Sequence, residues 1–476
     1  MESDNNISTL YVDLDGTYIK TDLLFESFIS AVKSNPLVIF YCFIWLRQGK
    51  AHLKYKLAQY CDINIELMPV SDEFNRFLVQ EKEKGRKIVL ATASTEKFAR
   101  QVVVNSEIFD DYIGSSESNN IKGAAKLSRI KEQNKEFAYA GNDFVDFELF
   151  KDANEAFLVN PSQKVLEASK QYDIKKVFDT QSSNQLACWI KQLRVHQWLK
   201  NLLIFVPLMV SGMLFQPGSI FLSLLAFSSF SSLASATYIF NDLLDLESDR
   251  SHPRKKERPL AAGNISILDG LRASILLIVC SLVIAMSTSS EFTVVLIAYL
   301  GLTLAYSFKI KQYIGMDVVM LAMLYTVRII AGAAVLGIQA SFWLLAFSIF
   351  IFLSLALVKR CSEIHSMQKT GKERASGRDY TVGDYSVLVS FGASSAMLAV
   401  LMFCFYINNS ALSDQYQQPD SLWLIIPGLC YWLMRMWIKT HRGEMDDDPI
   451  VFSLKDRGSL ITIGFCCLIT LMAQVI

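Results

Sequence analysis

Charged residues are scarce in this sequence. Only 19% of the 476 residues are Asp, Glu, Lys or Arg, whereas 52% are hydrophobic, and the mean hydropathy is +0.29. Soluble globular domains average about 25% charged residues, so the composition disfavours that class for the whole chain and favours an integral membrane protein. The 46 basic and 46 acidic residues cancel. Net charge therefore gives no sign of a polyanionic partner, and we expect no bound nucleic acid.

Paired cysteines and a secretion signal are also missing. The nine cysteines include no C-x-x-C pair and no metal-ligand spacing, and several lie inside apolar runs. This pattern is typical of small buried side chains in a reducing compartment. The first residues, MESDNNIS, contain neither a basic segment nor an apolar core. We therefore expect no signal peptide, and we expect the N-terminal domain to be cytoplasmic.

Two compositional regimes follow one another along the chain. Up to about residue 185 the sequence has charged helical stretches and short β-branched runs, and from about residue 200 it is a series of long apolar segments. The composition changes near FDTQSSNQ. We predict a soluble α/β domain over residues 1–180 and an all-α membrane domain over residues 181–476.

The second regime predicts a polytopic helical bundle. A bilayer crossing needs about 20 residues, and about nine segments approach that length. They lie at residues 201–216, 219–240, 271–288, 291–308, 317–337, 341–358, 386–407, 420–438 and 458–476. Lys and Arg gather in the loops after the second, fourth, sixth and eighth segments, whereas QPGS, STSSE, GIQA and NNSALSDQYQQPD contain none. The positive-inside rule therefore predicts a multi-pass protein of the inner (plasma) membrane with the basic loops in the cytoplasm.

Acidic and hydroxyl residues follow strand-like runs in the first regime. LYVDLDGT ends a short apolar run with Asp13 and Asp15, and its glycine allows a sharp turn. KIVLATAS contains Thr92, Lys122 opens a later segment, and FAYAGNDFVDFELF ends a third run. Parallel α/β folds carry their chemistry at the carboxyl ends of strands. This order predicts a catalytic site at one sheet edge.

The same ordered pieces resemble the haloacid dehalogenase (HAD) superfamily of phosphatases over roughly residues 8–165. The resemblance implies a Rossmann-like α/β domain with a helical cap between Asp15 and Thr92. It implies that Asp13 is the nucleophile that forms an aspartyl-phosphate and that Asp15 is the general acid and base. Thr92 and Lys122 would hold the phosphoryl oxygens. The apolar run PLVIFYCFIWL within the cap is too short to span a bilayer, so we interpret it as cap core, with a surface resting on the bilayer as the alternative.

The resemblance also implies a Mg²⁺ site. Its ligands would come from Asp13, Asp15, Asn142, Asp143 and Asp146. The family motif reads Gly-Asp, whereas this chain has Gly-Asn followed by Asp143. Either Asn142 or Asp143 would complete the site, and a domain without catalytic activity remains an alternative, because a carboxylate is the usual ligand for this hard cation.

An acidic helix end follows the second apolar segment. In YIFNDLLDLESDRSHPRKKERP, Asp242, Asp245 and Asp249 are spaced i, i+3 and i+7, which places three carboxylates on one helix face. Asn241 lies beside them. The carboxylates would repel one another without a cation, so we predict Mg²⁺ that bridges them to a diphosphate. An ordinary solvated helix end is the alternative.

Residues 190–476 resemble the UbiA superfamily of intramembrane prenyltransferases, through N-D-x-x-D-x-x-x-D. The segments RVHQWLKN, DRSHPRKKERPLAAG, YSFKIKQYIGMD with VRIIAG, and LVKRCSEI are similar to its polyprenyl-phosphate phosphoribosyltransferase branch. The resemblance implies nine transmembrane helices and a diphosphate held through Mg²⁺ by the first aspartate motif. A second motif of several aspartates is typical of prenyl-diphosphate enzymes, but here Asp317 is followed by VVML.

Further polar residues are interpreted as substrate ligands. Arg328 lies inside a predicted span, where burying a charge is costly, so we expect a functional partner for it. For the other cations, a role in topology or headgroup binding is the alternative. The full set of expected substrate ligands in this half is Lys200, Asn241, His252, Lys255, Arg258, Tyr306, Lys309, Asp317, Arg328, Lys359 and Arg360.

These expectations combine into one predicted function. The membrane half would transfer 5-phosphoribose from phosphoribosyl diphosphate to polyprenyl phosphate, and the HAD-like domain would remove the 5-phosphate to yield polyprenyl-phosphoryl-ribose. A tethered phosphatase would meet its substrate at high effective concentration. Alternatives are an aromatic prenyltransferase with an accessory or inactive phosphatase domain, and a transporter or lipid-binding protein with a regulatory domain. The polyprenol length is not predicted, and whether the chain forms a homo-oligomer is left open.

Overall fold

The computed structural model describes residues 8–117, 119–178, 184–369, 371, 379–409, 416–445 and 448–475. The predicted domain boundary at residue 180 and parts of the loops at 370–378 and 410–415 lie outside these residues. Contacts divide the chain into two units. The first contains Met1–Leu193 and Tyr238–Ala273, and the second contains Arg194–Thr237 and Ser274–Ile476. The segment Tyr238–Ala273 thus belongs with the N-terminal domain. The prediction of a single boundary near residue 180 did not include this segment in the N-terminal domain.

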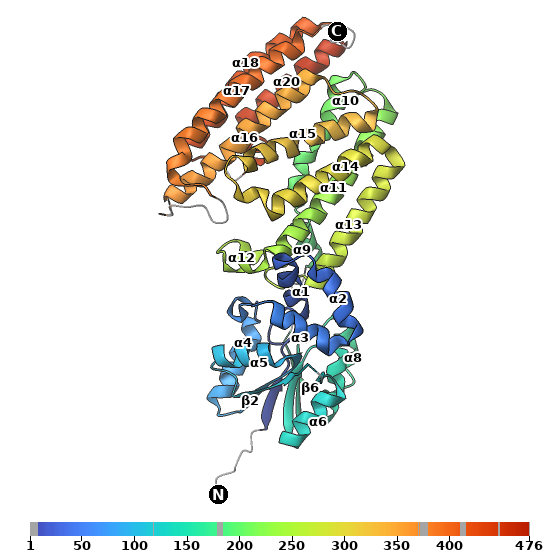
Figure 1. Cartoon of the computed structure of the whole chain (residues 1–476), viewed down its shortest axis with the longest axis vertical. Helices are drawn as coiled ribbons and strands as arrows, with labels where there is room; N and C mark the ends of the chain where they lie inside the picture. The colour runs from blue at the N-terminus through green and yellow to red at the C-terminus, as the bar shows by residue number, and fades with distance from the viewer. Residues whose placement is uncertain are drawn as a thin grey trace. The chain divides into compact units, whose positions relative to one another are not determined.

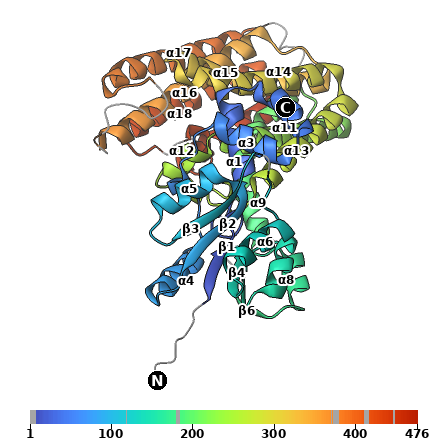
Figure 2. The ribbon, with the colours of Figure 1, turned by 60° about the horizontal axis from the view of Figure 1, so that its bottom comes forward.

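The first unit contains a parallel sheet of six strands in the order β3-β2-β1-β4-β5-β6. Figure 2 shows β1, β2 and β3 side by side. The strands are β1 (Thr9–Val12), β2 (Ile88–Thr95), β3 (Asp111–Ser115), β4 (Phe137–Gly141), β5 (Glu155–Val159) and β6 (Ile174–Phe178). Three of them are the apolar runs that the sequence predicts as strands, and those predictions are confirmed.

Helices cover both faces of this sheet. Alternate strand residues point to opposite faces, so Leu10 and Val12 pack in one apolar cluster and Tyr11 packs in another. The first cluster includes residues of α4 (Asp72–Glu83) and α5 (Glu96–Asn105), and the second includes residues of α6 (Ala124–Gln133), α7 (Phe147–Asp152) and α8 (Gln163–Ser169). The remaining elements of the unit are α1 (Leu23–Ser34), α2 (Val38–Arg47), α3 (Lys50–Tyr60), η1 (Ile65–Leu67), η2 (Phe144–Asp146), α9 (Gln185–Gln192), α12 (Leu246–Ser251) and η4 (Lys255–Glu257).

The insert between Asp15 and Thr92 is helical, as predicted, but α2 is not its core. Val38 is the one buried residue of α2. Phe40 and Phe43 are each 67% exposed. The interpretation of PLVIFYCFIWL as cap core is therefore wrong. Apolar composition predicts burial, but packing on α1 and α3 buries only Val38 of this helix and leaves most of its other side chains exposed.

Eight helices in the described part of the chain are long and apolar enough to cross a membrane. They include α11 (Pro217–Leu244) and α13 (Ile267–Thr288), each of which begins in one unit and ends in the other. The others lie in the second unit, where α16 and α17 are side by side (Figure 1). The second unit contains η3 (Val195–Phe205), α10 (Val206–Val210), α14 (Ser290–Phe308), η5 (Ile310–Gln312), α15 (Met316–Leu336), α16 (Phe342–Lys369), η6 (Val382–Asp384), α17 (Tyr385–Ile407), η8 (Pro419–Leu424), α18 (Ile425–His441), α19 (Pro449–Ser453) and α20 (Arg457–Val475).

The first predicted span, residues 201–216, does not form a membrane-length helix, so the prediction of nine spans is wrong by one in the described residues. The segment is divided between η3 and α10, because Pro207 has no N–H to donate and Gly212 adopts a positive φ of 72° just beyond α10. It packs tightly on α15 instead. A Cβ on Gly332 would lie 2.1 Å from the carbonyl oxygen of Ile204.

Candidate active sites

Asp13 lies at the carboxyl edge of the sheet, immediately after β1. Its N–H donates to the carbonyl of Ala140 on β4 (2.9 Å), and Gly16 makes the following turn at φ +76°. A cavity of about 630 Å³ opens at this edge. Its lining includes all but one of the predicted phosphatase residues, namely Asp13, Asp15, Lys122, Asn142, Asp143 and Asp146.

Asp15 is oriented by two donors. Its Oδ1 accepts from the N–H of Leu23 (2.8 Å), and its Oδ2 accepts from the hydroxyl of Ser94 (2.6 Å). Thr92, the remaining predicted residue, is fully buried, and its Oγ1 accepts from the N–H of Ser94 (2.9 Å). Ser94 thus connects Thr92 to Asp15 through two hydrogen bonds.

Lys126 is the cation that contacts the predicted nucleophile, and the sequence prediction missed it. Its Nζ lies 2.8 Å from Oδ1 of Asp13 and donates to the hydroxyl of Tyr139 at 3.0 Å. Lys122 is exposed and lines the same cavity. The sequence could have indicated Lys126, because it lies four residues before the apolar Ile130 on α6 and therefore shares the buried face of that helix.

Both carboxyls that the sequence predicts to be catalytic have raised pKa values. Burial raises the pKa of Asp13 to about 7, with the nearby charge of Lys126 opposing the shift and Asp146 adding to it. Burial raises the pKa of Asp15 to about 6, and the neighbouring charge of Asp22 adds to that shift. Carboxyls poised near neutrality in a cavity are typical of acid–base chemistry.

Asp146 holds the loop after β4. One of its carboxylate oxygens accepts from the N–H groups of Asn142 (2.9 Å) and Asp143 (3.1 Å), and the other accepts from the hydroxyl of Tyr139 (2.8 Å). Asp143 is exposed, whereas the Asn142 amide lies against Gly16, where a Cβ would come within 2.2 Å of its Nδ2.

Oxygen donors at this edge have the chemistry that Mg²⁺ prefers. However, no group of three or more His, Cys, Asp or Glu side chains in the described residues is arranged to hold a metal ion. The carboxylates fit Mg²⁺ as donors but do not form a closed set of ligands. That either Asn142 or Asp143 completes the Mg²⁺ site stays a prediction.

The acidic segment, which begins with Asp242 in the last turn of α11, is not one continuous helix, contrary to the prediction. The helix breaks at Asp245 (φ −101°, ψ 12°), between α11 and α12. Asp242 and Asp249 nevertheless meet, because Nη1 of Arg258 donates to both, at 3.0 Å and 2.6 Å. The prediction that the carboxylates lie on the same face of the segment is confirmed for Asp242 and Asp249.

Arg258 supplies positive charge where the sequence predicts Mg²⁺. Asp242 and Asp249 are only 4% and 2% exposed, and Gln192 donates to the second oxygen of Asp242 at 2.9 Å. Burial raises the pKa of Asp249, while Arg258 opposes the shift. Arg258 is thus a cation beside these carboxylates, and the bridging Mg²⁺ stays a prediction. Their oxygen donors still suit Mg²⁺.

The remaining predicted residues of this segment are less buried. Asn241 and Asp245 are half-buried, and His252 and Lys255 are exposed. Nδ1 of His252 accepts from two backbone N–H groups, those of Arg254 (3.2 Å) and Lys255 (3.3 Å), so this imidazole shapes the turn that leads to Arg258.

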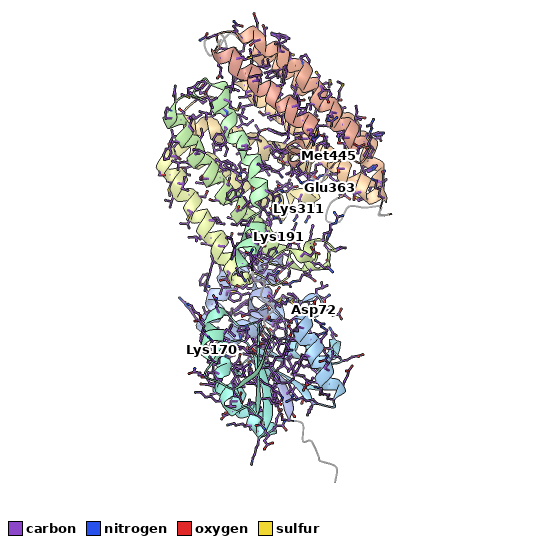
Figure 3. All side chains as sticks on the ribbon, turned by 180° about the vertical axis from the view of Figure 1, so that it is seen from behind. Asp72, Lys170, Lys191, Lys311, Glu363 and Met445 are labelled. Carbon is purple, nitrogen blue, oxygen red and sulfur yellow. The ribbon has the colours of Figure 1, made fainter. Side chains whose placement is uncertain are left out.

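Asp317 is the centre of a polar cluster in the second unit. It is fully buried and accepts from Nε of Arg360 (2.6 Å) and from the hydroxyl of Tyr380 (2.6 Å). Arg360 also pairs with Glu363, which is labelled in Figure 3, and donates to the hydroxyl of Tyr306 at 3.4 Å. Arg360 and Asp317, predicted separately as substrate ligands, thus bind each other.

Arg328 is surrounded by protein groups. Its Nε donates to Oδ1 of Asn201 (2.8 Å), Nη2 donates to the hydroxyl of Tyr299 (3.2 Å), and the guanidinium lies 5.3 Å from the ring centre of Phe230. It therefore joins η3, α11 and α14 to α15. Of the other predicted cations, Lys200 is buried and pairs with Asp448, Lys359 is half-buried and Lys309 is exposed.

Comparisons with known proteins identify relatives of both parts of the chain. Residues 204–456 match the model of the UbiA prenyltransferase family. The chain is 34% identical to the uncharacterized protein y4nM of Sinorhizobium fredii over 96% of this chain and 90% of that protein. It is 29% identical to the decaprenyl-phosphate phosphoribosyltransferase of Mycolicibacterium smegmatis over 58% of this chain and 88% of that enzyme. A solved UbiA homolog from Archaeoglobus fulgidus bound to GPP and Mg²⁺ is 17% identical, with a TM-score of 0.46, and covers 60% of this chain and 99% of that one.

Proposed function

The chain belongs to the UbiA prenyltransferase family, and from that membership we propose that this integral membrane protein transfers 5-phosphoribose from phosphoribosyl diphosphate to a polyprenyl phosphate. The bond between C1 of the ribose and the diphosphate breaks, a bond from C1 to an oxygen of the lipid phosphate forms, and inorganic diphosphate leaves. Similarity to an enzyme named for phosphoribosyl transfer supports this choice within the family.

The observation that carries the proposal is the environment of Asp317. It has no neighbouring carboxylate in sequence, and in the structure its two oxygens accept from Arg360 and Tyr380. A second metal-binding pair of aspartates is therefore not built there. Arg360, Tyr306 and Tyr380 place N–H and O–H donors around Asp317, and such donors suit phosphate oxygens rather than a second metal ion.

Asp242, Asp245 and Asp249 are proposed to hold the leaving diphosphate, with Asn241, His252, Lys255 and Arg258 as further ligands. Mg²⁺, when bound, supplies the positive charge that stabilises the departing diphosphate. Asp242 and Asp249, which now accept from Arg258, would hold the ion, and Arg258 would then be available to a phosphate oxygen. In the second unit, Lys200, Tyr306, Lys309, Arg328, Lys359 and Arg360, with Asp317, are the proposed ligands of the sugar and lipid phosphates.

The N-terminal domain is proposed to be a HAD-like phosphatase that removes the 5-phosphate. Asp13 attacks phosphorus, the ester bond breaks as Asp15 gives a proton to the leaving hydroxyl, and water then hydrolyses the aspartyl-phosphate. Thr92, Lys122 and Lys126 bind the phosphoryl oxygens. Mg²⁺ would be held by Asp13, Asp15, Asp146 and either Asn142 or Asp143, and would stabilise the charge on the phosphoryl oxygens. The product is polyprenyl-phosphoryl-ribose, and the proposed location of both sites is the cytoplasmic side of the inner membrane.

One experiment tests both steps. The purified protein in nanodiscs receives polyprenyl phosphate, Mg²⁺ and phosphoribosyl diphosphate, and mass spectrometry resolves the phosphorylated and dephosphorylated lipids. We expect the dephosphorylated lipid from the wild type and the phosphorylated lipid from Asp13→Asn. Turnover only with a prenyl diphosphate and an aromatic acceptor would instead establish aromatic prenylation. Unchanged products from Asp13→Asn would refute the phosphatase role alone.

A further inference from the structure

The wall of the phosphatase cavity includes a segment that leads into a candidate membrane span. Residues Gly263–Asp269 line the cavity together with Asp13 and Lys126. The same residues lead into α13, one of the helices long and apolar enough to cross a membrane. The sheet domain therefore does not enclose this cavity by itself.

Close packing holds this wall in place. Gly263 has a φ of +72°, and a Cβ on it would lie 2.7 Å from Cβ of Lys20 and 3.2 Å from Cγ of Pro69. Arg250, from the same segment, is buried against Glu26 and donates to the carbonyl of Ala261 at 3.1 Å. The wall is thus part of the folded unit.

The lining combines two kinds of surface. Lys122 and Lys126 line the cavity among several aspartates, and their ammonium groups suit the oxygens of a phosphate. Trp189, Ile265 and Leu268 add apolar side chains to the same lining. This arrangement fits a phosphate on a group that also has apolar parts.

Resting on the phosphatase role proposed above, we propose that this cavity takes a phosphomonoester carried by a membrane lipid in preference to a soluble one. The reaction consumes one water, breaks the ester bond, and releases inorganic phosphate and a lipid-linked hydroxyl. Because the wall begins a membrane helix, a lipid-linked phosphate reaches the cavity from the bilayer at high effective concentration. A soluble phosphomonoester has no such advantage.

The test compares substrates with the full chain in nanodiscs. We expect kcat/KM for phosphate release to be at least about 100-fold higher for polyprenyl-phosphoryl-ribose 5-phosphate than for ribose 5-phosphate, the ratio expected from tethering. Similar values for the two substrates would overturn the inference. Should the two values be similar, loss of both activities in Asp13→Asn would show that the phosphatase assignment stands although the lipid preference fails.

Gly263→Ala tests the wall itself. It adds a Cβ where there is no room, so we expect kcat/KM to fall at least tenfold for the lipid-linked substrate and little for ribose 5-phosphate. Gly85→Ala is the matched control, since Gly85 has a similar φ of +82° with no atom within 4 Å. Leu268→Gln provides a second variant should Gly263→Ala not fold. Equal losses for both substrates in each wall variant would contradict the role of the wall.

A different observation carries a second inference, at α2. This helix exposes Phe40, Phe43 and Ile44, with exposed fractions of 67%, 67% and 55%. At ten residues it is too short to span a bilayer, which needs about 20. Exposed cations flank it, Lys33 before and Arg47 at its end.

We infer that α2 lies in the interfacial region of an anionic leaflet. Apolar side chains then enter the acyl boundary, and the flanking cations meet lipid phosphates. A chain with membrane spans always has such a surface within reach. The flanking cations Lys33 and Arg47 and the exposure of Phe40 and Phe43 both favour lipid over a protein groove.

Photo-crosslinking tests this contact. Benzoylphenylalanine replaces Phe43 in the full chain, reconstituted in nanodiscs that contain phosphatidylglycerol, and mass spectrometry identifies the adducts after irradiation. Val104 on α5, 74% exposed in the same unit, is the control position. We expect lipid adducts at position 43 and few at position 104. Adducts between two copies of the chain, or equal lipid adducts at both positions, would overturn the inference.

Discussion

Arg250 and Glu26 form a buried ion pair across 224 residues of the chain, with two guanidinium nitrogens of Arg250 at 2.6 Å and 3.2 Å from the two carboxylate oxygens of Glu26. Glu26 lies on α1 of the predicted cap, and Arg250 lies in the segment that follows α11. A buried charge is costly unless it is paired, so this contact fixes the segment on the N-terminal domain.

Arg250→Met should destabilise the first unit, because Glu26 would keep a buried charge without its partner. The expected loss is about 3–5 kcal/mol. Glu26→Leu in the same chain should restore much of it. Thermal unfolding in detergent measures both. Arg272→Met is the control, since Arg272 is exposed and pairs only with Asp269 at 3.4 Å. Equal effects of the two single variants would contradict the role of burial.

Lys126→Met should reduce dephosphorylation by roughly 100-fold or more, as removal of one preorganised donor does in other active sites. Lys122→Met should have a smaller effect, because Lys122 is exposed and Lys126 contacts Asp13 directly. Phosphate release from the lipid product is measured, with phosphoribosyl transfer as the internal control. A larger loss for Lys122→Met would restore the original assignment.

Asp245→Ala should lower phosphoribosyl transfer by about 100-fold, consistent with several kcal/mol of charge stabilisation by the ion and its ligands. Excess EDTA should stop transfer in the wild type. Glu247→Ala, two residues further along and exposed, removes the same charge and should change transfer less than twofold. Isothermal titration of Mg²⁺ with phosphoribosyl diphosphate is the second measurement. A variant Asp245→Ala with unaltered transfer would remove the proposed diphosphate site.

Tyr380→Phe should destabilise the second unit by about 1.5–3 kcal/mol, because its hydroxyl donates to the buried Asp317 carboxylate at 2.6 Å. Tyr385→Phe is the matched control. Among the described residues, the Tyr385 hydroxyl is buried and has no hydrogen-bond partner. Its removal should change the unfolding temperature little. If the two variants unfold alike, the Asp317 cluster contributes less than its geometry implies.

Acid should lower the stability of the N-terminal domain, because it protonates two carboxylates that bind Arg86. Arg86 donates to Glu81 (2.7 Å) and Glu155 (2.8 Å). Burial raises the pKa of both carboxyls, but hydrogen bonds from Arg86 and neighbouring lysines outweigh it, so each pKa is below its usual value. The stabilisation is therefore present above the unfolded pKa of about 4.3 and is lost as pH falls through the folded values.

Proteolysis rates measured from pH 6 to pH 3 should rise steeply below about pH 4.3 in the wild type. Arg86→Met should flatten that dependence. Arg129→Met is the control, because its pair with Glu132 is exposed. A pH profile that Arg86→Met leaves unaltered would show that other carboxyls govern acid sensitivity.

The sequence by itself determined most of the membrane-length helices, three of the strands and the order of the motifs. Apolar runs of membrane length predicted eight of the helices that the structure contains, and apolar runs ending in Asp13 and Asn142 predicted strands at one sheet edge. These predictions succeeded because span length, strand alternation and the position of a residue at a strand end are local properties of the chain.

Tertiary structure alone decided which charges meet. It brought Lys126 to Asp13, placed Arg258 between Asp242 and Asp249, and left α2 exposed. It also made residues 263–269 part of the wall of the cavity that contains Asp13. The physical reason is that burial and ion pairing depend on side chains that approach from distant parts of the chain, and one sequence pattern is compatible with several such arrangements.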